Sequence, residues 1–193
     1  SVSGSPYSLV LSFSVNGSVY AGDTFDVTVR VVDSLGQNVA DYAGLIEMST
    51  LDPQITGTLS HQFAASNFGA YTFTGVDLKT AGSQFILVQE IGGTSLTISQ
   101  SLTVLPDSNH GKIVIHNQPA GSGLHAGDLF TSQPAFQLQD PYGNPIEQAG
   151  VTITLSSMNA SCATLGTGSL LVNGTSYSAP TAVTDNSGIA TFS

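Results

Sequence analysis

The sequence is poor in charged side chains, and basic ones are the scarcest. Three of its 193 residues are Lys or Arg and thirteen are Asp or Glu, which gives a formal net charge of −10 at pH 7. Arg30, Lys79 and Lys112 cannot neutralise a run of phosphates, and anionic lipid headgroups would repel the chain. These counts argue against nucleic acids and membrane surfaces as partners.

Cysteine and long apolar runs are scarce as well. Cys162 is the single cysteine and has no partner for a disulfide within this sequence, so it is interpreted as a small buried apolar residue. An intermolecular bridge, or a partner outside this segment, is the alternative. No stretch approaches the roughly 20 apolar residues of a membrane span. The sequence begins at Ser1 without a Met or a basic-then-apolar signal, and we expect a processed or excerpted segment.

The spacing of the apolar residues predicts strands. Hydrophobic residues make up 40% of the chain, which is enough for packed cores. Residues 24–31 alternate strictly between apolar and polar, and 95–105 and 151–155 follow the same period of two. Apolar runs at 85–88 and 113–115 predict strands covered on both faces. With Gly, Asn, Asp and Pro between these segments at turn-like spacing, the pattern predicts an all-β protein.

Three segments recur in the same order along the chain. The matching pairs are 21–25 with 126–130, 31–36 with 138–143, and 69–73 with 188–192. The offset grows from 105 residues at the first pair (126 − 21) to 119 at the third (188 − 69), so the second copy holds an insertion, expected between Ser156 and Thr184. The repeat predicts two tandem domains of one kind, residues 1–106 and 107–193.

The second copy stops earlier than the first. Strand patterns follow Phe73 at 85–90 and 95–105, whereas the corresponding Phe192 is followed by one residue. We expect the second sandwich to lack its last strands, which later residues of a parent chain or a neighbouring molecule would supply. The residues predicted for the two cores are Phe25, Val27, Val29, Val31, Tyr71 and Phe73 in the first and Phe136, Leu138, Val151, Ile153, Leu155 and Phe192 in the second.

The repeats resemble two families of Ig-like modules. A strand ending in Asp, a tight turn and a V-x-I-x-L strand (140–145, then 151–155) resemble the bacterial Ig-like repeats of invasin-type and other large surface adhesins. Asp33-Ser34-Leu35-Gly36, Gly69 to Phe73 and Thr80-Ala81-Gly82 are similar to filamin-type repeats. The resemblance implies Ig-like β-sandwiches in a tandem array of an extracellular or cell-surface protein, without catalytic residues. Ala190 departs from the pattern because it stands where the first copy has Tyr71.

Acidic residues are the first candidates for chemistry. Asp33 and Asp140 stand where a strand meets a turn, and an Asp there accepts hydrogen bonds from backbone N–H groups two or three residues on. The alternative is a calcium site built from Asp23, Asp33, Asp107, Asp128 and Asp140. The dense spacing of calcium loops is absent, so we predict turn formers and no bound cofactor.

Neither a zinc site nor an enzyme is predicted. His61, His110, His116 and His125 do not form H-x-H or H-E-x-x-H, and Cys162 is remote from them in sequence. No G-x-S-x-G motif is present, although a Ser–His–Asp triad assembles only in three dimensions.

Three sequons mark candidate N-glycosylation sites. They begin at Asn16, Asn159 and Asn173, and all three lie in predicted loops. A surface this poor in charge needs another source of solubility, which glycans or burial in an assembly would provide.

The sequence is typical of a structural or adhesive repeat segment. We expect stalk repeats of an adhesin, a surface layer, or subunits of a filament, with neighbouring Ig-like repeats or identical subunits as partners. The alternative is a carbohydrate-binding module that uses the loops around Tyr142, Tyr177 and the insertion, although the chain has no Trp to stack on a sugar.

Overall fold

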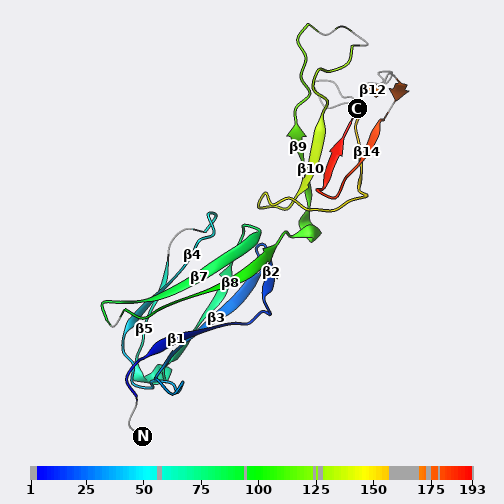
Figure 1. Cartoon of the computed structure of the whole chain (residues 1–193). Helices are drawn as coiled ribbons and strands as arrows, with labels where there is room; N and C mark the ends of the chain where they lie inside the picture. The colour runs from blue at the N-terminus through cyan, green and yellow to red at the C-terminus, as the bar shows by residue number, and fades with distance from the viewer. Residues whose placement is uncertain are drawn as a thin grey trace. The chain divides into compact units, whose positions relative to one another are not determined.

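The computed structural model describes residues 4–55, 58–93, 95–123, 125, 128–156, 170–172, 175–177 and 179–192, with the backbone only for 170–177. The chain forms two compact units, Ser1–Pro106 (unit 1) and Asp107–Ser193 (unit 2), each described by itself below. Both are built from strands (Figure 1). No helix in the described part is long and apolar enough to cross a membrane.

Unit 1 is a sandwich of two sheets. One sheet has the order β1-β3-β6 and the other has the order β2-β8-β7-β4-β5. The strands are β1 (Ser8–Phe13), β2 (Ser18–Tyr20), β3 (Thr24–Val32), β4 (Leu45–Thr50), β5 (Leu59–Gln62), β6 (Ala70–Asp77), β7 (Gly82–Ile91) and β8 (Thr97–Leu105), with one turn of 3-10 helix, η1 (Ala65–Asn67).

Alternation in the sequence places one face of each sheet in the core. On β3, Val27, Val29 and Val31 are fully buried while the residues between them are partly exposed. From the facing sheet, Ile46 and Val88 are equally buried. The strands β1, β3 and β6 lie in one sheet and β4, β7 and β8 in the other, as strands A, B, E and C, F, G do in Ig domains. The predicted Ig-like, all-β class is therefore confirmed.

Unit 2 repeats the first half of this plan. Its sheets have the orders β15-β10-β9, β11-β14 and β12-β13. The strands are β9 (Lys112–Asn117), β10 (Ala135–Gln139), β11 (Thr152–Thr154), β12 (Leu170–Val172), β13 (Thr175–Tyr177), β14 (Thr181–Val183) and β15 (Ile189–Thr191), preceded by η2 (Ser108–His110). Ile153, Ala190 and Phe192 form its buried cluster. No strand in the described part of unit 2 corresponds to β2, β7 or β8.

Backbone hydrogen bonds identify equivalent positions in the two units. The Val31 N–H donates to the Gly69 carbonyl over 2.9 Å, and the Leu138 N–H donates to the Gly188 carbonyl over the same distance. The Val31 carbonyl accepts from the Val39 N–H, as the Leu138 carbonyl does from the Ile146 N–H. Gly69 and Gly188 have φ of 72° and 70°. The sequence matches at 31–36 and 69–73 are therefore structural matches, whereas Gly127 of the first match lies outside the described residues.

The structure corrects the prediction that two strands are covered on both faces. Phe85 on β7 is 42% exposed, and Ile113 and Ile115 on β9 are 54% and 53% exposed. An apolar run is compatible with a strand covered on both faces, but the run itself does not indicate whether other segments pack on the second face.

The predicted cores are largely right, with differences at their rims. Tyr71 is half-buried, and its ring stacks on that of His61 from β5 with the centroids 3.4 Å apart. Among the described strands, β5 and β6 are each the last strand of their sheet, so this pair links the two sheets at their rim. Phe136, Val151 and Leu155 in unit 2 are likewise half-buried.

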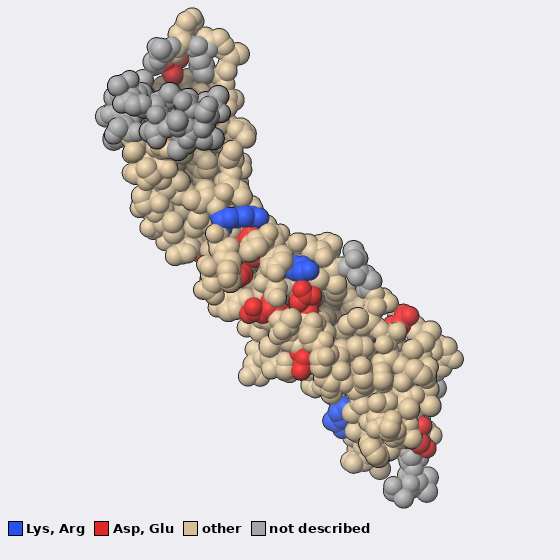
Figure 2. Space-filling view, turned by 180° about the vertical axis from the view of Figure 1, so that it is seen from behind, with Lys and Arg blue, Asp and Glu red and all other residues tan. Residues whose placement is uncertain are grey.

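The surface is mostly neutral, as the composition predicts. Figure 2 shows Lys and Arg side chains only singly on the face drawn, among large areas without charge.

Candidate functional site

A parallel strand pair ties the beginning of unit 1 to its end. β2 pairs with β8 in the register Ser18 with Thr103, Val19 with Val104 and Tyr20 with Leu105. Two further bonds flank this pair: the Thr103 N–H donates to the Gly17 carbonyl over 2.9 Å, and the Ala21 N–H donates to the Leu105 carbonyl over 2.8 Å. We call residues 17–21 together with 103–105 the terminal clamp.

Buried side chains and a turn hold the terminal clamp in place. Val19, Ala21 and Val104 are at most 7% exposed. Gly22 follows with φ of 85°, and its N–H donates to the Leu78 carbonyl over 2.8 Å. The repeated Ala-Gly-Asp segment in the first copy is thus the turn that carries the chain from the clamp into β3.

Asp-x-x-Gly turns recur at three places and share one hydrogen-bond pattern. The Asp Oδ1 atom accepts from the backbone N–H groups two and four residues later, over 2.8–3.0 Å, and the Gly three residues later has positive φ. The turns begin at Asp33, Asp140 and Asp185. The role predicted for Asp33 and Asp140 is confirmed. Asp185 was missed, although its Asp-Asn-Ser-Gly sequence carries the same signal.

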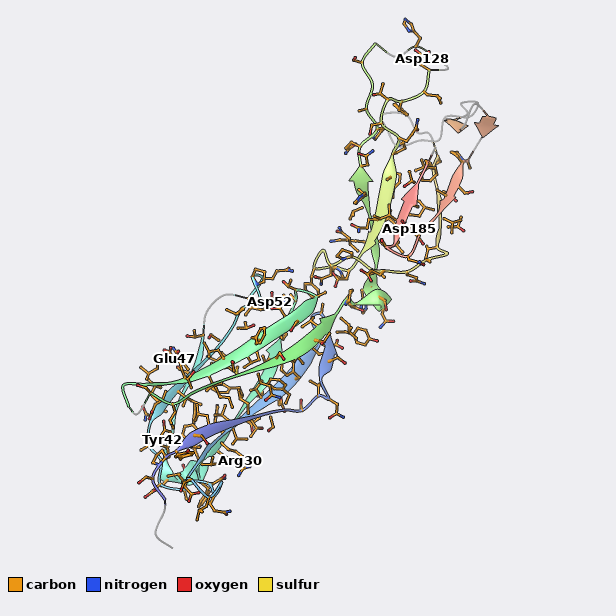
Figure 3. All side chains as sticks on the ribbon, viewed as in Figure 1. Arg30, Tyr42, Glu47, Asp52, Asp128 and Asp185 are labelled. Carbon is orange, nitrogen blue, oxygen red and sulfur yellow. The ribbon has the colours of Figure 1, made fainter. Side chains whose placement is uncertain are left out.

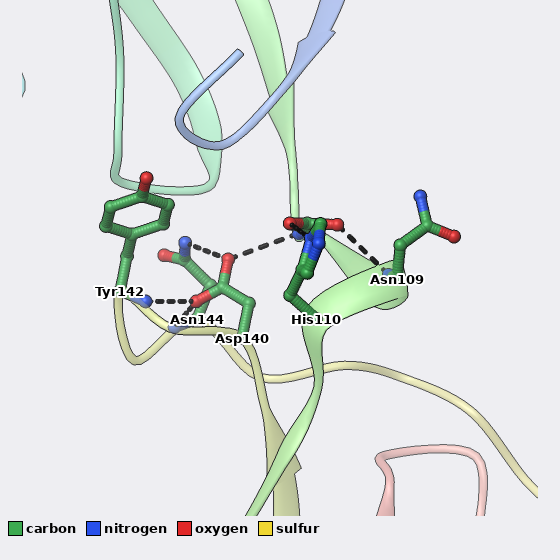
Figure 4. A network of polar contacts seen from close by, with 6 residues as sticks. Asn109, His110, Asp140, Tyr142 and Asn144 are labelled. Atoms are coloured by element: carbon green, nitrogen blue, oxygen red, sulfur yellow. Dashed lines mark hydrogen bonds and ion pairs between the residues drawn. The ribbon is translucent and has the colours of Figure 1, made fainter.

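In unit 2, the Asp140 turn is the centre of a larger polar network (Figure 4). Asp140 is fully buried, and its Oδ2 atom accepts from the Asn144 Nδ2 atom over 2.7 Å and from the Asp107 N–H over 3.2 Å. Its Oδ1 atom accepts from the N–H groups of Tyr142 and Asn144. The carboxylate therefore joins the first residue of unit 2 to the turn after β10.

Asp107 extends this network to the η2 turn. Its Oδ1 atom accepts from the Asn109 N–H over 3.0 Å, and its Oδ2 atom accepts from the His110 Nδ1 atom over 2.5 Å. The hydrogen bond from the His110 side chain is the main cause that lowers the pKa of the Asp107 carboxyl.

Asp52 forms a second buried carboxylate site, which sequence reasoning missed (Figure 3). It lies between β4 and β5 and is 2% exposed. Its Oδ2 atom accepts from the N–H groups of Lys79 and Thr80 over 2.6 and 2.8 Å, and its Oδ1 atom accepts from the Gln54 N–H and the Thr80 hydroxyl over 2.9 and 2.6 Å. Burial opposes ionisation, but these bonds outweigh it and lower the pKa of Asp52.

Of the other predicted site residues, the structure describes the side chains of Asn16 and Tyr142. Asn16 is exposed in the bend between β1 and β2, beside the terminal clamp, so its sequon is accessible. Asn159, Asn173 and Cys162 lie outside the described residues, as does the side chain of Tyr177. Tyr142 is half-buried.

The five Asp residues proposed as calcium ligands do not converge. Within the described ranges, no three His, Cys, Asp or Glu side chains gather as a metal site. Asp107 and Asp140 are neighbours, but backbone N–H groups point at their oxygens. Asp128 instead accepts from the His125 N–H over 2.7 Å.

Calcium is therefore expected to leave the protein unchanged. Adding millimolar calcium, or a chelator, should shift the melting temperature of the full chain by less than about 1 °C, because a ligand stabilises only by binding the native state. Differential scanning calorimetry with magnesium as the control tests this. A concentration-dependent rise of several degrees with calcium alone would contradict it.

Comparison with known proteins found likenesses only among solved structures. No protein-family model matches, and no curated protein matches. Invasin, a bacterial integrin-binding protein, is similar over 96% of this chain and 33% of its own, at 14% identity and a TM-score of 0.44. The adhesin InvE of Yersinia pseudotuberculosis is similar over 95% of this chain and 49% of its own, at 17% and 0.42. A superoxide reductase (neelaredoxin) from Ignicoccus hospitalis is similar over 52% of this chain and 82% of its own, at 16% and 0.38. The chain thus spans a third to a half of the two adhesins.

Proposed function

We propose that this chain is a structural, non-enzymatic repeat segment that carries mechanical load within a larger extracellular or cell-surface protein, such as an adhesin stalk or a filament. The terminal clamp of unit 1 is the observation that carries the proposal. Neighbouring Ig-like repeats, or identical subunits, are its partners.

The geometry of the terminal clamp suits tension. When the two ends of unit 1 are pulled apart, the force acts on β2 through its N-terminal end and on β8 through its C-terminal end. Because the two strands are parallel, this pull acts along both strands in opposite directions, so the bonds of Gly17, Ala21 and Thr103 are strained together. An antiparallel hairpin pulled from its open end would instead lose its bonds one at a time. Unit 1 can then yield only after the whole clamp slides.

Replacing Thr103 by proline tests the clamp. Thr103 is exposed, and its N–H donates to Gly17, so the change removes that bond, at a cost of about 1 kcal/mol in unfolding free energy. We expect a clear fall in the force at which unit 1 unfolds when the full chain is pulled by its ends, since forced unfolding is governed by the unfolding rate.

Ser99→Pro is the matched control. Ser99 is also exposed on β8, and its N–H has the same direction as that of Thr103 by strand alternation, but β2 pairs only with 103–105. This variant should keep the wild-type unfolding force. Equal forces for Thr103→Pro and wild type would refute the mechanical role of the clamp. Specific binding of the wild-type chain on a glycan array would favour the carbohydrate-binding alternative.

A further inference from the structure

Unit 2 exposes an apolar face on β9, whereas the equivalent face of unit 1, on β1, is buried. On β9, Ile113 and Ile115 pair with Leu138 and Phe136, and are 54% and 53% exposed. On β1, Leu9 and Leu11 pair with Val31 and Val29, and are 4% and 7% exposed.

These two pairs of residues occupy the same position in the fold. Val31 and Leu138 are equivalent because each donates its N–H to the carbonyl of the positive-φ glycine before the last strand of its own three-stranded sheet, and each accepts from the N–H eight residues later. Residues directly opposite each other in a sheet share a face, so Ile113 and Ile115 point to the core side, as Leu9 and Leu11 do. The difference in exposure therefore lies in what covers them.

In unit 1, the covering layer is the antiparallel pair β7–β8. β8 packs against β1, with Leu102 and Val104 at 2% and 1% exposed. β7 pairs with β4, and β4 thus has a hydrogen-bonded neighbour on both edges. In unit 2, β11 corresponds to β4 but pairs only with β14 among the described strands. An exposed inner face and a strand edge without a neighbour among the described strands thus occur together in unit 2.

We propose that unit 2 binds a β-hairpin with the alternating pattern of Gly82–Leu105, which pairs antiparallel with the edge of β11 opposite β14 and covers Ile113 and Ile115. The hairpin is joined in cis to β15. In unit 1 the four residues 78–81 connect β6 to β7. A connection of the same length after β15 would therefore bring the hairpin to the edge of β11. A second copy of this chain is a poorer source, because its own hairpin already completes its unit 1. The edge of β11 offers main-chain hydrogen bonds to the hairpin, and burial of the two isoleucines against its apolar face stabilises the complex.

The test joins a second copy of residues 74–106 directly after Phe192 in the full chain, because Phe192 corresponds to Phe73. Hydrogen exchange followed by mass spectrometry should show the amides of β9 and β11 slowed at least about tenfold relative to the original chain. The melting temperature of unit 2 should rise by roughly 10 °C or more. A control extension with Asp in place of the residues copied from Leu102 and Val104 should give neither effect.

A pair of variants ties the result to the proposed face. Ile113→Ser together with Ile115→Ser should change the melting of unit 2 by no more than about 2 °C in the original chain, and by several times as much in the extended chain. If the extension leaves exchange at β9 and β11 unchanged, or if the serine variants act equally in both chains, the proposed site is wrong. If peptide 74–106 added separately at micromolar concentration protects as well as the joined copy, attachment in cis is wrong, because only the joined copy has a millimolar effective concentration.

Discussion

Replacing Asp52 by alanine is expected to lower the unfolding free energy of unit 1 by about 3 kcal/mol or more. The side chain is 2% exposed and accepts four hydrogen bonds, three of them from backbone N–H groups. Each hydrogen bond to a charged group is worth about 1.5–3 kcal/mol, and the change leaves buried donors without an acceptor. Calorimetry of the full chain would measure the shift of the unit 1 transition, with the exposed Asp41→Ala as the control. A loss no larger than that of the control would contradict the role assigned to Asp52.

The same residue predicts a dependence of stability on pH. The pKa of Asp52 in the folded state lies below its ordinary value of 3.8, so the unfolded chain binds the proton more readily. The stabilisation is complete above the unfolded pKa and is lost as the pH falls through the lowered folded pKa. Asp52→Asn removes the titration, so the difference in unfolding free energy between wild type and this variant should shrink as the pH falls from 5 to 2. A constant difference over this range would show that Asp52 does not titrate in this way.

Replacing Gly188 by alanine is expected to destabilise unit 2 by about 3 kcal/mol or more. The residue has φ of 70°, and a Cβ atom there would lie far inside contact distance of the Ile146 carbonyl oxygen, at 2.0 Å. The left-handed conformation alone costs an alanine roughly 1–2 kcal/mol, and the blocked backbone adds to that cost. The substitution therefore strains the turn that begins β15.

Gly143→Ala separates the two contributions. Gly143 also has positive φ, at 92°, but a Cβ atom there would meet nothing within 4 Å. Thermal or chemical unfolding of the two variants should differ by more than about 1 kcal/mol, with Gly188→Ala the less stable. Similar losses would show that conformation alone matters and that the close approach of Ile146 relaxes.

Local sequence patterns predicted the features whose partners are near in the chain. The alternation over 24–31 defined the buried face of β3, because the period of a strand is a property of its own backbone. Asp33 and Asp140 were predicted as turn formers with N–H partners two or three residues later, and the observed partners, two and four residues later, are equally local. Asp52 was missed for the opposite reason: Lys79 and Thr80 follow it by 27 and 28 residues, and no spacing rule connects them.

The sequence by itself determined the all-β class, the buried face of the alternating strands, the Asp-x-x-Gly turns and the repeat of one plan in two units. These features follow from backbone periodicity and from hydrogen bonds within a few residues. Only the tertiary structure decided that β2 joins β8 in parallel, that Asp52 is buried, and that Leu9 and Leu11 are covered while Ile113 and Ile115 are exposed. Burial depends on whether a second sheet lies over the strand, and that layer is contributed by distant segments that the strand's own residues do not encode.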